Sequence, residues 1–284
     1  MTLQIWQIYF KPEQRSALDN AFAAFDNSGV AGETLEFNVF QRLFLGEAAG
    51  FDRWGALSWR FHEKTGLTGD RLIEIVRAAP EVDVFYMNPS PKDEALYESP
   101  WVQGEISHPG LLEIAKAVLQ ILGYPLNSVY CLAHSTDYSL CNYFVGSPQF
   151  WQAYIPFVER VLDQAERELP ESLRVKLHSS DADWRGLHHQ STYVPFLVER
   201  LLSVFMQEEG RHLRGQQVKL PMRETKLSPA LFELREMKDV AIRTQSGRIL
   251  ERWRKERDAY VLAHHTPAWC ERFLPVLRGV PAVF

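Results

Sequence analysis

Short apolar runs alternate along the chain with segments in which apolar residues recur every three or four positions. Five runs have the length and the aromatic or β-branched composition of buried strands, namely 3–10, 54–61, 82–87, 128–133 and 142–145. The helical spacing covers 12–25, 34–44, 68–79, 109–122, 150–169 and 193–206. This alternation predicts an α/β fold in which helices cover both faces of a mostly parallel central sheet.

The composition changes beyond residue 215 to charged, helix-forming sequence. Ser228-Pro229 is a typical helix start, and residues 248–265 interleave acidic and basic side chains around Leu250 and Trp253. We interpret this segment as a helix with a solvated face, the alternative being a helix that docks on a membrane surface or a partner. The sequence therefore predicts one domain over 1–215 and a helical C-terminal extension over 216–284 that packs on it.

The chain of 284 residues carries 31 Lys and Arg against 36 Asp and Glu, without a long run of either sign. Bulk electrostatics therefore does not support binding to nucleic acid. The cysteines, Cys131, Cys141 and Cys270, form no C-x-x-C pair and fit buried thiols in a reducing compartment. Neither a signal peptide nor a membrane-spanning run is indicated. We expect a cytoplasmic protein, with peripheral attachment at the inner face of the membrane left open.

Signatures of several enzyme classes are absent from the sequence. It contains no G-x-S-x-G elbow, no G-x-x-x-x-G-K-[ST] loop and no G-x-G-x-x-G. The adjacent histidines His188-His189 and His264-His265 lack the i, i+4 spacing of a helical zinc site. The candidate functional residues are therefore those in the polar loops at the strand ends, where ligands of α/β sheets bind.

Two acids occupy alternate positions around the start of the strand over 82–87. Glu81 and Asp83 would point the same way from a strand and could hold Mg²⁺ or Mn²⁺ against a diphosphate. The alternative is a pair of solvated acids. The strand closes in the proline-rich turn Asn88-Pro89-Ser90-Pro91, which puts the Asn88 amide at its far end.

Asp137 is the one formally charged side chain between residues 117 and 158. An isolated buried carboxylate is costly, so Asp137 is hydrogen-bonded, paired or used in chemistry if this stretch is interior. The alternative is a surface acid that caps a turn. Asn142, in the same stretch, offers an amide suited to sugar or nucleotide hydroxyls.

A turn-rich segment places Trp101, Gln103, Glu105 and His108 within eight residues. A stacking ring with an amide, an acid and an imidazole would suit a polar cyclic ligand and predicts a binding loop. The alternative is a packed Trp101 followed by a segment that caps the next helix.

Long segments of varied composition between about residues 3 and 207 carry a resemblance to a known family. They are IWQIYF, FDNSG, Glu36, WGALSWRFHEKTG, DVFYMNP, WVQGEISHPG, NYFVGSPQFW and YVPFLVERLLSVF. Together they resemble a bacterial family of sugar transferases with the glycosyltransferase-A type fold, found in the biosynthesis of surface and capsular polysaccharides.

The resemblance implies a nucleotide-sugar donor bound over the first strands and a glycan or lipid-linked acceptor. It puts Asp83 near the usual metal-binding acid pair, although this chain has Glu81-Val82-Asp83 where the family has Asp-x-Asp. It also implies a further set of residues at or beside the donor and acceptor: Lys64, Asn142, Phe150, Trp151, Glu199 and Arg200.

Sugar transfer requires stabilisation of the leaving diphosphate, which Asp83 with its metal and Lys64 could supply. An inverting enzyme also requires a carboxylate base, for which Asp137 and Glu105 are both candidates. We therefore predict a glycosyltransferase. The alternatives are a non-catalytic binding or assembly subunit of the same fold and a hydrolase with paired carboxylates.

Overall fold

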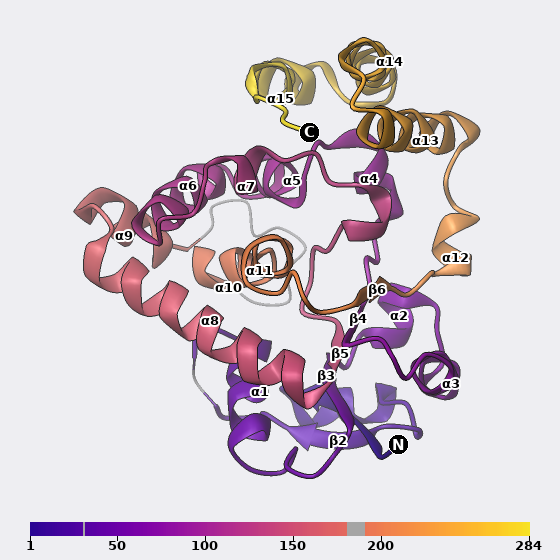
Figure 1. The fold of residues 1–284 in the computed structure, drawn as a ribbon, viewed down its shortest axis with the longest axis vertical. Helices are drawn as coiled ribbons and strands as arrows, with labels where there is room; N and C mark the ends of the chain where they lie inside the picture. Colours follow the sequence, from indigo (N-terminus) through magenta and orange to yellow (C-terminus); the bar gives the residue numbers. More distant parts are fainter. Residues whose placement is uncertain (31, 181–190) are drawn as a thin grey trace.

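The computed structural model describes residues 1–30, 32–180 and 191–284. Within these ranges six strands form one sheet in the order β2-β1-β3-β5-β4-β6 (Figure 1). The strands are β1 (Leu3–Tyr9), β2 (Ala23–Asp26), β3 (Arg53–Ser58), β4 (Val84–Tyr86), β5 (Phe144–Gly146) and β6 (Gly215–Gln217). Of these strands β5 runs antiparallel to both neighbours, and the other pairs are parallel. The prediction of an α/β fold with a mostly parallel sheet is confirmed.

Helices cover both faces of the sheet because side chains alternate along each strand. In β1, Trp6 and Ile8 enter one core and Ile5 enters the other. The first core includes α1 (Glu36–Leu45), α6 (Leu111–Ile121), α8 (Pro148–Glu168), α10 (Tyr193–Val198) and α11 (Leu201–Glu208). The second core includes α2 (Phe61–Thr65) and α3 (Gly69–Ala78), which lie across the sheet from α8 in Figure 1.

Three C-terminal helices, α13 (Pro229–Thr244), α14 (Gly247–His264) and α15 (Pro267–Gly279), gather at one end of the molecule (Figure 1). They share a third core with α4 (Pro91–Leu96) and α5 (Pro100–Ser107). Buried charge also joins them, since the Arg257 guanidinium of α14 donates to Glu98 at 2.6 Å and both side chains are 0% exposed. The remaining helical elements are η1 (Pro12–Ala17), α7 (Asn127–Tyr130), η2 (Ser135–Asp137), α9 (Glu171–Leu177) and α12 (Pro221–Glu224).

No helix in the described ranges is both long enough and apolar enough to cross a membrane. The segment over 248–265 is confirmed as a helix with a solvated face, because α14 buries Leu250 and Trp253 while Arg252 and Lys255 are exposed.

The helix predicted over 12–25 is wrong. After η1 the chain turns at Asp19, whose backbone N–H donates to the buried Gln7 side chain at 2.6 Å. The Asp19 carboxylate in turn accepts the backbone N–H groups of Ala21 and Gly69. This polar anchor ends the helical turn, and the apolar residues that follow pair with β1 as β2.

Two further predictions differ from the structure. The strand predicted over 128–133 is instead α7, followed by an isolated bridge from Cys131 to Val283. The helix predicted over 193–206 is divided into α10 and α11 at Glu199 and Arg200, where the Arg200 N–H bonds the Leu197 carbonyl in a tighter turn. Glu199 and Arg200 therefore lie between the two helices and not within one continuous helix.

Candidate active site

The order of the strands creates a switch point at the carboxyl edge of the sheet. The chain runs from β1 to β2 on one side and then to β3 on the other. In open α/β sheets ligands bind outside the carboxyl ends of the strands at such a point. Because β5 is antiparallel, it begins at this edge, and the Met87 N–H after β4 bonds the Tyr143 carbonyl. Asn142 therefore lies at the edge where ligands are expected.

A cavity of about 210 Å³, here called the α1 crevice, opens at the ends of β1 and β2. It is lined by Phe10, Asn27, Gly29, Val30, Gly32, Leu35 and Asn38. Leu35 has a φ of 46°, a strained conformation for a branched residue and one that is enriched at functional sites. The Asn38 Oδ1 atom is buried and accepts no hydrogen bond from the described residues. An aromatic ring beside an open amide is suited to a planar polar ligand such as a nucleobase.

Glu199, between α10 and α11, is the centre of a group of charged residues at the same edge. Its side chain is 26% exposed. The pKa of Glu199 is raised to about 7, mainly by burial, with Glu36 adding to the rise and Arg200 and Lys64 opposing it. Burial likewise raises the pKa of Cys141 to about 12, with Lys64, Glu199 and Glu36 acting on it. These shared influences mean that Glu36, Lys64, Cys141 and Glu199 lie within electrostatic range of one another, and we call them the Glu199 cluster.

Glu36 joins the Glu199 cluster to the α1 crevice. It is the first residue of α1, and its neighbours Leu35 and Asn38 line the crevice. Lys64 comes from α2, which directly follows β3, and its Nζ atom lies 5.5 Å from the centre of the Tyr143 ring. A ligand that fills the crevice and continues along the edge therefore meets an ammonium group and a carboxyl group with a pKa near neutrality.

Asn142 is 3% exposed, and neither atom of its amide has a hydrogen-bond partner among the residues that the structure describes. Asn88 provides a comparison at 4% exposure. Its Nδ2 atom donates to Glu94 at 2.8 Å and its Oδ1 atom accepts from the Ser90 N–H at 3.0 Å. A buried polar group without a partner costs about 1–3 kcal/mol. The open amide of Asn142 is thus suited to a ligand, whereas the Asn88 amide serves the fold.

This contrast gives a prediction. Asn142→Leu, which keeps the side-chain shape and removes the open amide, is expected to raise the free energy of unfolding by about 1 kcal/mol. Asn88→Leu is the matched control and is expected to lower it by about 1–3 kcal/mol, because Glu94 and Ser90 lose a partner. Urea unfolding of both variants measures the difference. Equal destabilisation by the two substitutions would contradict a ligand role for the Asn142 amide.

Arg200 holds Glu199 in place rather than presenting its own charge. The side chain is 3% exposed. Its Nε atom donates to the Pro100 carbonyl at 3.0 Å, and Nη2 donates to Gln103 Oε1 at 2.6 Å. Nη1 donates to the Phe196 carbonyl at 2.8 Å. The guanidinium therefore ties the turn between α10 and α11 to α5, and its donors are used within the fold.

Glu81 and Asp83 lie at the amino end of β4, on the opposite edge of the sheet from the Glu199 cluster. Asp83 Oδ1 accepts from the Ser147 hydroxyl at 3.3 Å, and Oδ2 accepts from the Arg214 N–H at 2.9 Å. Glu81 is exposed. Across the described ranges no three His, Cys, Asp or Glu side chains are grouped as metal ligands. The two acids do not fit a Mn²⁺ or Mg²⁺ site, because Asp83 links β4 to the segments that follow β5 and α11.

The two acids predicted as catalytic bases have hydrogen-bond partners outside the Glu199 cluster. Glu105 Oε1 and Oε2 accept the backbone N–H groups of Gly110 and Leu112, each at 2.9 Å. Glu105 therefore caps α6, as the alternative interpretation of this segment had it. Asp137 is exposed in η2, where its Oδ1 atom accepts from the Thr136 hydroxyl at 3.1 Å.

The binding loop predicted around Trp101 and His108 is instead helix α5. Trp101 is 1% exposed in its packing, and the His108 ring stacks on Phe196 with 3.6 Å between ring centres. Of the histidine pairs, His188 and His189 lie outside the described residues, and the others stack on aromatic rings, His264 on Tyr260 and His265 on Trp269.

Phe150 and Trp151 are core residues of α8, with Trp151 donating its indole N–H to the Trp54 carbonyl at 3.1 Å. The sequence analysis did not identify Asn38 as a site residue. It named Glu36 only as part of the resemblance to the transferase family. The sequence signal available for Asn38 was its position in the first turn of α1. This helix connects β2 to β3, which lie on opposite sides of β1.

No protein-family model matches this chain, and no curated protein matches it. A solved structure with a similar fold is the apo form of WbbM, a bifunctional glycosyltransferase, with 12% sequence identity and a TM-score of 0.48. The similarity covers 78% of this chain and 45% of WbbM, so the chain spans less than half the length of that protein.

Proposed function

We propose that this protein is a glycosyltransferase that moves a sugar from a nucleotide-sugar donor to the hydroxyl group of a glycan or lipid-linked acceptor, with Glu199 as the base. The observation that carries the proposal is the open amide of Asn142 at the carboxyl edge of the sheet, with Lys64 over the ring of the next residue, Tyr143, and Glu199 within electrostatic range of Lys64. The resemblance of the sequence to sugar transferases gives independent support.

The donor would lie along the edge from the α1 crevice to the Glu199 cluster. Phe10 offers a stacking surface for the base, and Asn27 and Asn38 offer amides for its edge. Lys64 forms no ion pair with any residue in the described parts of the chain, so its charge is free to balance the diphosphate. Asn142 would hold hydroxyl groups of the sugar.

Transfer in this arrangement is a single displacement. The acceptor oxygen attacks the anomeric carbon while the bond from that carbon to the diphosphate oxygen breaks. The proton of the acceptor hydroxyl passes to the Glu199 carboxylate, and the nucleoside diphosphate leaves with the bonding electron pair. A base whose pKa is close to the working pH combines a large deprotonated fraction with a strong drive to take the proton. No step is assigned to a metal ion.

The proposal can be tested by thermal unfolding with nucleoside diphosphates and nucleotide sugars, each with Mg²⁺, with Mn²⁺ or with a chelator. One nucleotide class at about 100 times its Kd is expected to add about 2.7 kcal/mol to stability. Lys64→Met should reduce this gain, and Lys255→Met, an exposed lysine on α14, should leave it unchanged. Absence of any stabilisation by the full set would overturn the proposal.

Release of nucleoside diphosphate in the presence of glycan acceptors separates the proposal from its rivals. A non-catalytic subunit of the same fold would bind the nucleotide and release none. A glycoside hydrolase would use Glu36 and Glu199 as its two carboxylates, since Glu36 acts on the Glu199 pKa, and would cleave aryl glycosides without any nucleotide. Turnover that depends on both donor and acceptor is the expected result.

A further inference from the structure

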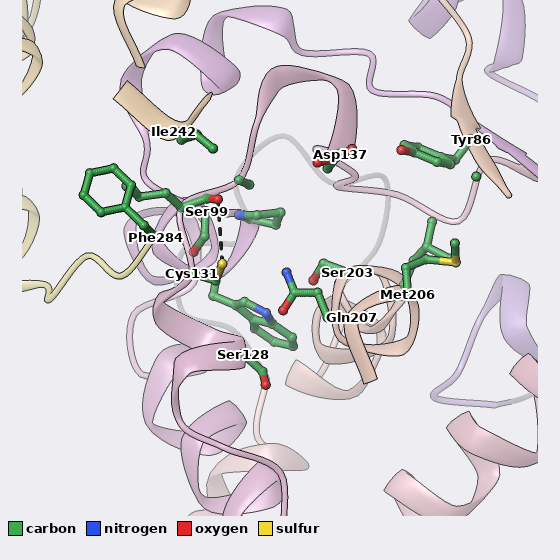
Figure 2. Close-up of a pocket in the computed structure, with 16 residues that line it drawn as sticks. Tyr86, Ser99, Ser128, Cys131, Asp137, Ser203, Met206, Gln207, Ile242 and Phe284 are labelled. Carbon is green, nitrogen blue, oxygen red and sulfur yellow. Dashed lines mark hydrogen bonds between the residues drawn. The ribbon is translucent and has the colours of Figure 1, made fainter. Parts of the chain in front are cut away.

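A cavity of about 460 Å³, separate from the α1 crevice, lies between α5, α7 and α11. Figure 2 shows Ser203, Met206 and Gln207 of α11 on one side of it and Ser99, Ser128 and Cys131 on the other. Tyr86 and Asp137 lie at one end, and Ile242 and Phe284 lie at the opposite end (Figure 2). The C-terminal segment is fixed there, because the Leu132 N–H donates to the Val283 carbonyl at 2.8 Å.

The wall of this cavity contains a buried donor that is not used. Trp101 lines the cavity at 1% exposure, and its indole N–H has no hydrogen-bond partner in the described ranges. The comparable indoles of Trp151 and Trp253 donate to the carbonyls of Trp54 and Ala95 at 3.1 and 3.0 Å. A buried donor without a partner destabilises the protein unless something else supplies an acceptor. The cavity is wide enough for a ligand to supply it.

Charge and apolar surface narrow the chemistry of that ligand. Pro100, Leu132, Leu202 and Ile242 give the wall much apolar surface. Asp137 lines the cavity, and none of the described lining residues is a lysine or an arginine. Among the described lining residues an anion would therefore meet a carboxylate and no compensating cation. The fitting ligand has an apolar body and an uncharged oxygen that accepts a hydrogen bond.

We propose that this cavity is a second binding site, which takes a small uncharged amphiphile and pairs its acceptor oxygen with the Trp101 indole N–H. The site shares a wall with the candidate active site, since the Arg200 carbonyl accepts the Ser203 hydroxyl at 2.7 Å and its guanidinium bonds Pro100. Its existence does not depend on the identity of the reaction at Glu199.

Calorimetric titration of the full chain with 3-phenylpropan-1-ol and with 3-phenylpropanoate tests the proposal, because the two probes share one apolar body and differ in charge. We expect saturable binding of the alcohol, and roughly tenfold weaker binding of the carboxylate. Asp137→Asn should narrow that difference, whereas Asp70→Asn, at an exposed position on α3, should not. Trp101→Phe should weaken the alcohol about fivefold by removing the indole donor.

Because Trp101 is fully packed, a second variant keeps the test independent of its folding. Ser203→Leu fills the cavity from α11 and removes one hydrogen bond within its own helical turn. It is expected to abolish binding of the alcohol, while Ser172→Leu, on the exposed surface of α9, leaves binding unchanged. The proposal would be overturned if the wild-type chain did not bind the alcohol. It would also be overturned if the Ser203→Leu variant still bound the alcohol.

Discussion

Glu199→Gln is expected to lower the rate of sugar transfer by at least about 100-fold, the loss typical of removing a general base. Glutamine keeps the shape of the side chain and its contact with Arg200, which lies 3.7 Å from the carboxylate. It cannot take the proton of the acceptor hydroxyl. Nucleotide binding, measured by thermal unfolding, should change little, because the proposed function assigns the donor to the α1 crevice and Lys64.

The pH dependence of this variant gives a second readout. Wild-type kcat/KM should rise with pH and level off above the Glu199 pKa of about 7, since the proposed base acts in its deprotonated form. The pKa is raised from its usual value, so the folded state binds the proton more tightly than the unfolded state. This carboxyl group therefore makes stability fall as pH rises through the window between the two values. Glu199→Gln should remove both the rise in kcat/KM and this contribution to the fall in stability.

Glu113→Gln, an exposed position on α6, is the matched control and should retain the wild-type rate and pH profile. A Glu199→Gln variant with more than half of the wild-type rate would remove Glu199 from the mechanism.

Arg257→Met should lower the free energy of unfolding by about 3–5 kcal/mol, because it leaves Glu98 as a buried carboxylate without its main partner. The Arg257 guanidinium donates to Glu98 at 2.6 Å and to Asp258 at 2.9 Å, and it also lies over the Trp253 ring. The Glu98 Oε2 atom already has no partner among the residues described. Urea denaturation followed by far-UV circular dichroism measures the loss.

The double variant Glu98→Leu with Arg257→Met should recover most of that loss, since an apolar pair of similar volume often replaces a buried ion pair at little cost. Arg252→Met, on the exposed face of the same helix, should change stability by less than about 0.5 kcal/mol. If Arg257→Met costs no more than Arg252→Met, the buried pair does not fasten the C-terminal helices to α4 and α5.

Hydrophobic periodicity was sufficient to predict the α/β class, because the strands that build the centre of the sheet are apolar on both faces. It failed where a long-range polar contact decided the local structure. The turn at Asp19 depends on Gln7 and Gly69, which no window around residues 12–25 contains. The helical apolar spacing over 193–206 likewise gives no sign that Arg200 bonds α5 and divides the helix.

The candidate site was predictable in its members more than in their roles. Lys64 and Glu199 were selected by resemblance, Asn142 was selected both by its amide and by resemblance, and Asn142 and Lys64 come from segments at the carboxyl edge of the sheet. The sequence could not show that burial would raise the pKa of Glu199 to about 7. Nor could it show that the Glu105 carboxylate would accept hydrogen bonds from two backbone N–H groups. These properties arise from contacts between distant segments. The roles assigned to Lys64, Asn142 and Glu199 stay predictions until the variants are measured.

The antiparallel strand β5 has a consequence for biosynthesis. β3 and β4 both pair with β5 and not with each other, and Trp54 of β3 meets Gly146 of β5. During translation the half-sheet of β1, β2 and β3 must therefore wait with an open edge until Gly146 has left the ribosome. At about 5–20 residues per second that wait lasts several seconds. The nascent chain thus exposes an unpaired strand edge for several seconds, and such an edge is a template for pairing with another chain.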